Sequence, residues 1–176
     1  SIRPDDVRFI LEDLEDLFPA GERSRNVEVV TTIRYESVWI RDYGPVVVES
    51  GQGQAFVDGA YYHNCPYDDA VPSWLAARSP GGEQLHRHGL RFEGGNLLSN
   101  GAGLCLTTTG IVDNNGLPRV AVEEVLRRYY GCETTLFLAP LLGEAVDHVD
   151  MFATFASEHL VLLGSYGPEQ DWLNHE

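Results

Sequence analysis

Short strand-forming runs, separated by turns that contain glycine or proline, are the feature that most limits the folds open to this chain. β-branched and aliphatic residues form these runs at 46–48, 54–57, 104–106 and 134–138. Helical periodicity lies between them, at 72–76 and 118–130. The order strand, strand, helix, strand therefore recurs along the sequence. This recurrence indicates a mixed α/β (α+β) fold built from quasi-repeats, and not a doubly wound parallel sheet.

The chain has the size and composition of one globular domain. It holds 176 residues, of which 43% are hydrophobic, and no linker separates a second domain, so residues 1–176 are interpreted as one unit. An amphipathic helix is expected at 4–18, a strand at 27–33 and a further helix from about residue 168. No run approaches the roughly 18 apolar residues of a membrane span, and the first residues lack the plan of a signal peptide. Because the sequence begins without methionine, the compartment stays open.

The charge limits the partners of the chain. A formal net charge of −15 argues against the phosphate backbone of nucleic acid and favours small cations or cationic side chains. An acidic surface also serves solubility, so the charge by itself identifies no ligand.

Three cysteines, Cys65, Cys105 and Cys132, are scattered along the chain. Their odd number and the lack of a C-x-x-C spacing suggest neither a disulfide framework nor a zinc knuckle. We expect reduced, partly buried thiols, each of which has to be considered as a nucleophile.

Two turns carry polar residues next to strands. The first is Trp39-Ile40-Arg41-Asp42-Tyr43-Gly44-Pro45, directly before the strand at 46–48. It places an acid at the mouth of a strand, where ligand-binding loops concentrate. The second is Glu93-Gly94-Gly95-Asn96, in which two glycines allow a close backbone approach between a carboxylate and an amide. A structural turn and a glycine-rich hairpin, respectively, would explain each motif equally well when it is taken alone.

A third motif, Asp147-His148-Val149-Asp150, is more specific. In a strand over 148–155, His148 and Asp150 would project from the same face and could address one ligand together. The alternatives are a hydrogen-bonded pair on a solvated face and a pair of metal ligands. The metal alternative is disfavoured, because the remaining histidines show no matching ligand spacing.

Together, Trp-x-Arg-Asp-x-Gly-Pro, Glu-Gly-Gly-Asn and Asp-His-Val-Asp resemble, in order and separation, the agmatine deiminase and bacterial peptidylarginine deiminase family of the guanidine-modifying pentein superfamily. The resemblance runs from about residue 27 to residue 166 and includes the connecting segment 66–72. It implies an incomplete pentein-type propeller, with about three of the five ββαβ units of a complete one.

The resemblance also implies roles for individual residues. Asp42 and Asp150 match the two carboxylates that bind the substrate guanidinium, and Trp39 and Asn96 fall in the same motifs as further substrate-binding candidates. His148 matches the general acid/base, and Glu93 matches the acid that orients this histidine. No metal or cofactor is implied, and the expected partner is a small guanidinium compound or an arginine-containing peptide.

In the reaction of this family a cysteine thiolate attacks the guanidinium carbon, ammonia leaves, and water releases a ureido product from a thiouronium intermediate. That cysteine lies in a glycine-rich segment near the C-terminus of the family domain, which has no counterpart in this sequence. Cys105 and Cys132 fall in scaffold positions, so only Cys65 could replace it. The chain is thus expected to be either a fragment of a deiminase or a degenerate domain.

Three functions remain open at this point: a deiminase, a non-catalytic guanidinium-binding or interaction domain, and an amidinotransferase. The sequence does not separate free agmatine, free arginine and peptidyl arginine as substrates. Asp147 stands where agmatine deiminases usually have glycine, which is closer to the peptidylarginine type.

Overall fold

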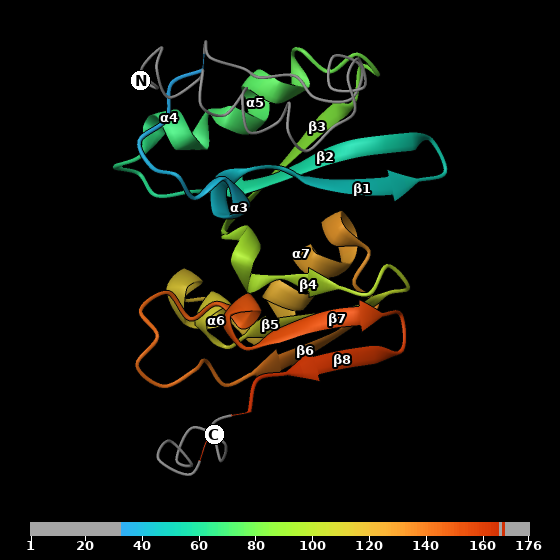
Figure 1. Cartoon of the computed structure of the whole chain (residues 1–176). Helices are drawn as coiled ribbons and strands as arrows, with labels where there is room; N and C mark the ends of the chain where they lie inside the picture. Colours follow the sequence, from blue (N-terminus) through green and yellow to red (C-terminus); the bar gives the residue numbers. More distant parts are fainter. Residues whose placement is uncertain (1–32, 166, 168–176) are drawn as a thin grey trace, which may run out of the picture.

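The computed structural model describes residues 33–165 and 167, drawn in colour in Figure 1. The helix expected at 4–18, the helix expected from residue 168 and nearly all of the strand expected at 27–33 lie outside the described residues. In chain order the elements are α3 (Ile40–Tyr43), β1 (Val46–Ser50), β2 (Gly53–Ala60), α4 (Pro66–Asp69), α5 (Val71–Ala76), β3 (Gln84–Arg91), η1 (Gly94–Asn96), β4 (Leu98–Ser99), β5 (Leu104–Thr108), α6 (Gly110–Asn115), α7 (Arg119–Tyr130), β6 (Thr134–Leu138), η2 (Val149–Met151), β7 (Ala153–Ser157) and β8 (Leu160–Leu163).

The strands form small sheets that repeat one topology. In the first sheet β1 pairs antiparallel with β2, and β2 pairs parallel with β3 after the crossover through α4 and α5. The second sheet repeats this order with β4, β5 and β6, and its crossover runs through α6 and α7. β7 and β8 form an antiparallel pair, as the first two strands of a unit do. The predicted mixed α/β fold is confirmed, with two complete ββαβ units and the opening hairpin of another in the described part of the chain.

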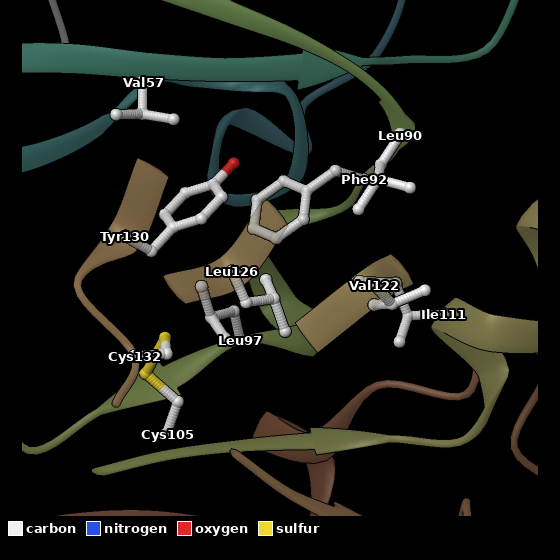
Figure 2. Close-up of a cluster of buried hydrophobic side chains, with 10 residues drawn as sticks. All are labelled: Val57, Leu90, Phe92, Leu97, Cys105, Ile111, Val122, Leu126, Tyr130 and Cys132. Carbon is white, nitrogen blue, oxygen red and sulfur yellow. A yellow bond between two sulfur atoms is a disulfide. The ribbon is translucent and has the colours of Figure 1, made fainter. Parts of the chain in front are cut away.

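The main hydrophobic core lies where α7 packs between the first and the second unit (Figure 2). Val122, Leu126 and Tyr130 recur every four residues on the buried face of this helix. Leu126 and Val122 are fully buried in a cluster that also contains Val57 of the first sheet, near Tyr130, and Ile111 of α6, next to Val122. A smaller cluster, built on Leu106 and Val149, joins the second unit to the β7–β8 hairpin. Among the described residues, no helix combines the length and the apolar content that crossing a bilayer requires.

Two short helices end in contacts that fix their position. The first backbone N–H groups of α4, from Tyr67 and Asp68, donate to the carboxylate of Glu36 at 2.9 Å each. This cap comes from a distant part of the sequence, so local propensity gives no sign of it. α6 ends at Gly116, which adopts the left-handed conformation at φ 58°.

The expectation of reduced thiols was wrong for two of the three cysteines. Cys105 of β5 and Cys132, which follows α7, form a disulfide with a Cα–Cα distance of 5.5 Å. The crossover through α7 returns the chain to the edge of β5, and this brings together two residues that are 27 positions apart. A loop of this length corresponds to roughly 3 to 4 kcal/mol of stabilisation in the chain-entropy description. Sequence spacing gives no sign of this pairing, because topology and not local proximity creates it.

A polar pair sits at the edge of the main core. His88 Nε2 and the Tyr130 hydroxyl oxygen are 2.6 Å apart, and His88 Nδ1 accepts a hydrogen bond from the Leu90 N–H. With Nδ1 as acceptor, the proton of the neutral ring is on Nε2 and is donated to Tyr130. Burial lowers the pKa of His88 to about 4, because the charged imidazolium would lose its hydration.

The burial of His88 beside Tyr130 predicts that the free energy of unfolding decreases in acid. Between about pH 6.5 and pH 4 the unfolded chain binds a proton at His88 that the folded chain does not, so stability falls as the pH falls through this window. The loss is at most roughly 3 kcal/mol. Urea unfolding at pH 7 and pH 4.5 should show a smaller pH difference in His88→Gln than in the wild type. The exposed His159→Gln is the control, and an equal pH difference in all three proteins would contradict the assignment.

Candidate functional site

The opening segment of each unit has the same place in the fold. α3 precedes β1, η1 precedes β4, and η2 precedes β7. α3 packs against η1, and η1 packs against η2. Polar residues that are far apart in sequence, from Asp42 to Asp150, therefore meet at one centre.

His148 is the best-connected side chain of this centre. Its Nε2 lies 2.7 Å from Glu93 Oε2, and its Nδ1 lies 3.6 Å from Asp42 Oδ1. The side chains of His148, Glu93 and Asp42 are 7%, 9% and 12% exposed. A buried imidazole thus stands between two carboxylates, one on each ring nitrogen.

Gly95 forms the floor of the centre. A methyl group at its Cα would lie 2.6 Å from His148 Nδ1, 2.8 Å from Asp42 Oδ1 and 3.1 Å from Asp150 Oδ2. The three polar atoms therefore converge on one point in front of Gly95, close enough for a single planar group to contact both aspartates. The Gly95 N–H also donates to Asp42 Oδ1 at 3.0 Å, which fixes the orientation of that carboxylate.

The pKa values reflect the crowding of acids. Burial raises the pKa of Asp42, with smaller contributions from Glu93 and Asp150, against the lowering effects of His148 and the Gly95 N–H. For His148 burial lowers the pKa, but the hydrogen bond to Glu93 and the charges of Asp42, Glu93 and Asp150 outweigh burial and raise it. Arg41 Nε lies 3.8 Å from Asp150 Oδ2 and a terminal nitrogen of Arg91 lies 3.7 Å from Glu93 Oε1, so arginines balance part of the acidic charge of this centre.

Trp39 and Asn96 are not among the residues whose atoms lie nearest to a side chain placed at Gly95. Trp39 precedes α3 and is 63% exposed. The side-chain oxygen of Asn96 accepts hydrogen bonds from the N–H groups of Thr108 (3.0 Å) and Val149 (3.2 Å). Asn96 therefore ties η1 to β5 and η2, and its amide oxygen is engaged in the scaffold.

His148 and Asp150 share the centre for a different reason than the one expected. The strand predicted from residue 148 begins only at Ala153, and η2 occupies 149–151. Asp147 adopts a left-handed conformation with φ 60°, which turns the chain just before His148. This conformation favours glycine, and an aspartate is among the few other residues that adopt it.

Asp68, which holds the segment leading into α3, was not among the candidate residues identified from the sequence. Asp68 is fully buried, and its carboxylate accepts hydrogen bonds from the N–H groups of Glu36 (2.7 Å) and Ser37 (3.1 Å) and from the Ser37 hydroxyl (2.8 Å). Its place in the segment 66–72, which shares the family resemblance, is the signal that could have drawn attention to it.

The described residues offer little for metal or thiol chemistry. Among residues 33–165 and 167, no group of three histidine, cysteine or acidic side chains could hold a metal ion. Cys105 and Cys132 are joined in the disulfide. Burial, Asp68 and Glu36 raise the pKa of Cys65, which makes this thiol a poor nucleophile near neutral pH.

Comparisons with known proteins agree with the motifs. The sequence model of the Porphyromonas-type peptidyl-arginine deiminase family matches residues 4–175 of the chain. Among curated proteins, the chain is 28% identical over 164 residues to an agmatine deiminase of Ectopseudomonas mendocina, which covers 84% of this chain and 43% of the relative. It is 30% identical over 158 residues to an agmatine deiminase of Pseudomonas putida, which covers 78% of this chain and 42% of the relative.

Solved structures share the fold. A substrate-bound agmatine deiminase from C. jejuni superposes with a TM-score of 0.70 at 22% identity, over 86% of this chain and 50% of that chain. The agmatine deiminase of Enterococcus faecalis gives a TM-score of 0.71 at 24% identity, over 78% and 42%. The chain thus spans half the length of these relatives or less.

The floor position of Gly95 predicts a selective effect of a methyl group. In Gly95→Ala the added carbon must push Asp42 and Asp150 away from His148, so the pKa of His148 should fall because it loses their favourable charge. NMR titration of the His148 ring measures this shift. Gly89→Ala, where an added methyl meets no atom within 4 Å, is the control. An unchanged His148 titration in Gly95→Ala would show that Gly95 does not face the three groups.

Proposed function

The chain belongs to the Porphyromonas-type peptidyl-arginine deiminase family, and on that premise we propose that residues 1–176 form a partial deiminase domain that binds the guanidinium group of its substrate. The substrate class is a small guanidinium compound, such as agmatine or arginine, or an arginine-containing peptide. Agmatine deiminases among the relatives support this class.

The convergence of Asp42, Asp150 and His148 in front of Gly95 is the observation that carries this proposal. A planar guanidinium presents several N–H donors in a fixed fork, and two carboxylates can bind it with charge-assisted hydrogen bonds.

The proposed reaction divides the roles among these residues. Asp42 and Asp150 hold the guanidinium, and a cysteine thiolate attacks its carbon to form a tetrahedral adduct. His148 donates a proton to the departing nitrogen, which leaves as ammonia, and the thiouronium remains on the sulfur. His148 then takes one proton from water as the water oxygen adds to the carbon. This oxygen loses its second proton to ammonia or solvent, and the C–S bond breaks, which releases the ureido product and the thiolate. Glu93 orients His148 throughout.

We place the nucleophile in the part of the relatives that this chain does not span. None of the cysteines in the described residues fits the role, because two form the disulfide and the pKa of Cys65 is raised. The centre alone supports binding without turnover, which is also what a non-catalytic guanidinium-binding domain would do.

The first test of this proposal is turnover by the purified chain. It should form no ureido product from agmatine or an arginine peptide, because acid/base assistance alone contributes only about 10²- to 10⁴-fold. Colorimetric detection of the ureido group measures this. Cys65→Ser should behave as the wild type does. Product formed by the wild type and lost in Cys65→Ser would make Cys65 the nucleophile.

The second test concerns the choice of cation. Calorimetry should show tighter binding of agmatine than of a diamine of similar length, because only the planar fork satisfies both aspartates. Asp42→Asn and Asp150→Asn should each remove this preference and weaken agmatine binding by roughly 2 to 5 kcal/mol. Asp113→Asn, at an exposed site of α6, makes the same change in net charge and should have no effect. Equal affinities for the two ligands in all variants would mean that net charge alone attracts them.

A further inference from the structure

Each oxygen of the Glu93 carboxylate has a nitrogen-bearing side chain nearby. Oε2 faces His148 Nε2 at 2.7 Å, and Oε1 faces a terminal nitrogen of Arg91 at 3.7 Å. Arg91 is the last residue of β3 and has no part in the reaction as proposed above. Its guanidinium nevertheless lies next to Glu93, which contacts the proposed acid/base residue His148.

Arg91 is fixed at its backbone and at its head group. The Arg91 N–H donates to the side-chain oxygen of Asn115 at 2.8 Å, and the Arg91 carbonyl accepts from the side-chain nitrogen of Asn115 at 3.0 Å. The guanidinium carbon lies 4.1 Å from the centre of the Tyr62 ring, as in a stacked cation–π contact. The position of the charge relative to Glu93 is therefore determined by β3, α6 and Tyr62.

The contacts of the Arg91 head group point to Glu93. Arg91 Nε is buried and has no hydrogen-bond partner within the described part of the chain, whereas the side chain as a whole is 39% exposed. Arg91, Glu93 and His148 line one small cavity. Besides the Tyr62 ring, the charged group paired with the Arg91 guanidinium among the described residues is the Glu93 carboxylate.

Resting on the proposed deiminase function, we propose that Arg91 and Tyr62 are positioning residues that keep the Glu93 carboxylate ionised and turned toward His148 Nε2. An ionised Glu93 accepts the Nε2 proton and so holds the ring with Nδ1 toward Gly95, where the substrate would lie. A protonated Glu93 would instead donate to Nε2 and leave the proton of a neutral ring on Nδ1. The charge of Arg91 thus influences whether Nδ1, the ring nitrogen that faces the substrate position, carries a proton in the neutral ring.

The titration of Glu93 agrees with this geometry. Burial alone would raise the pKa of Glu93. The hydrogen bond with His148, the nearby Tyr62 hydroxyl and the charges of His148 and Arg91 outweigh burial and lower the pKa of Glu93.

The test follows Glu93 and His148 by NMR in the isotope-labelled chain, without substrate. In Arg91→Met the titration midpoint of the Glu93 carboxyl should rise, and the exchange of the His148 Nε2 proton with water should become about tenfold faster or more, since a charge-assisted hydrogen bond is weakened. Tyr62→Phe keeps the ring and removes the hydroxyl, so it should shift both readouts in the same direction by less. Arg91→Lys keeps the charge and should restore much of the Glu93 midpoint.

Arg119→Met is the matched control. Arg119 also stacks on an aromatic ring, that of Phe137 at 4.2 Å, and pairs with a carboxylate, that of Glu123 at 2.9 Å, but it lies on the exposed side of α7. It should leave Glu93 and His148 unchanged. Unchanged readouts in folded Arg91→Met and Tyr62→Phe, or equal changes in Arg119→Met, would overturn the proposal. Because no ligand is used, a failure of agmatine to bind would count against the proposed function alone.

Discussion

At Gly94 the backbone of η1 approaches the carbonyl of Arg41 so closely that no side chain could be accommodated there. The next residue, Gly95, leaves room for three polar groups from two other segments. The distances from Asp42 to Gly95 and to His148 depend on this contact between α3 and η1. The absence of side chains at Gly94 and Gly95 thus allows α3 and the three polar groups to approach the backbone of η1.

The repeated topology explains why the acids converge. Each unit begins with a short helical segment before its first strand, and these segments pack on one another. The first supplies Asp42, the second Glu93 and Gly95, and the third His148 and Asp150. The buried face of α7 holds the first two units together, and the disulfide links β5 to the end of α7 within the second unit, so the core that stabilises the fold also sets the geometry of the centre.

The order of the elements and the three motifs could be predicted from the sequence, because hydrophobic periodicity and turn-forming residues are local signals. The helix predicted at 118–130 and the strand predicted at 134–138 correspond to α7 and β6. The sequence did not indicate features that depend on distant partners: the cap that Glu36 supplies to α4, the Cys105–Cys132 pairing and the role of Asp68 in holding residues 36 and 37. The short helix η2 was missed because a three-residue 3-10 turn has no periodicity of its own.

The central claim is that Asp42 and Asp150 bind one guanidinium group together. A crystal structure of the chain with agmatine tests it most directly. The account predicts a planar guanidinium in front of Gly95, with nitrogen atoms within hydrogen-bond distance of both carboxylates and with His148 Nδ1 facing the group. Agmatine bound through its amine end, bound to only one of the two aspartates, or bound elsewhere on the chain would contradict it.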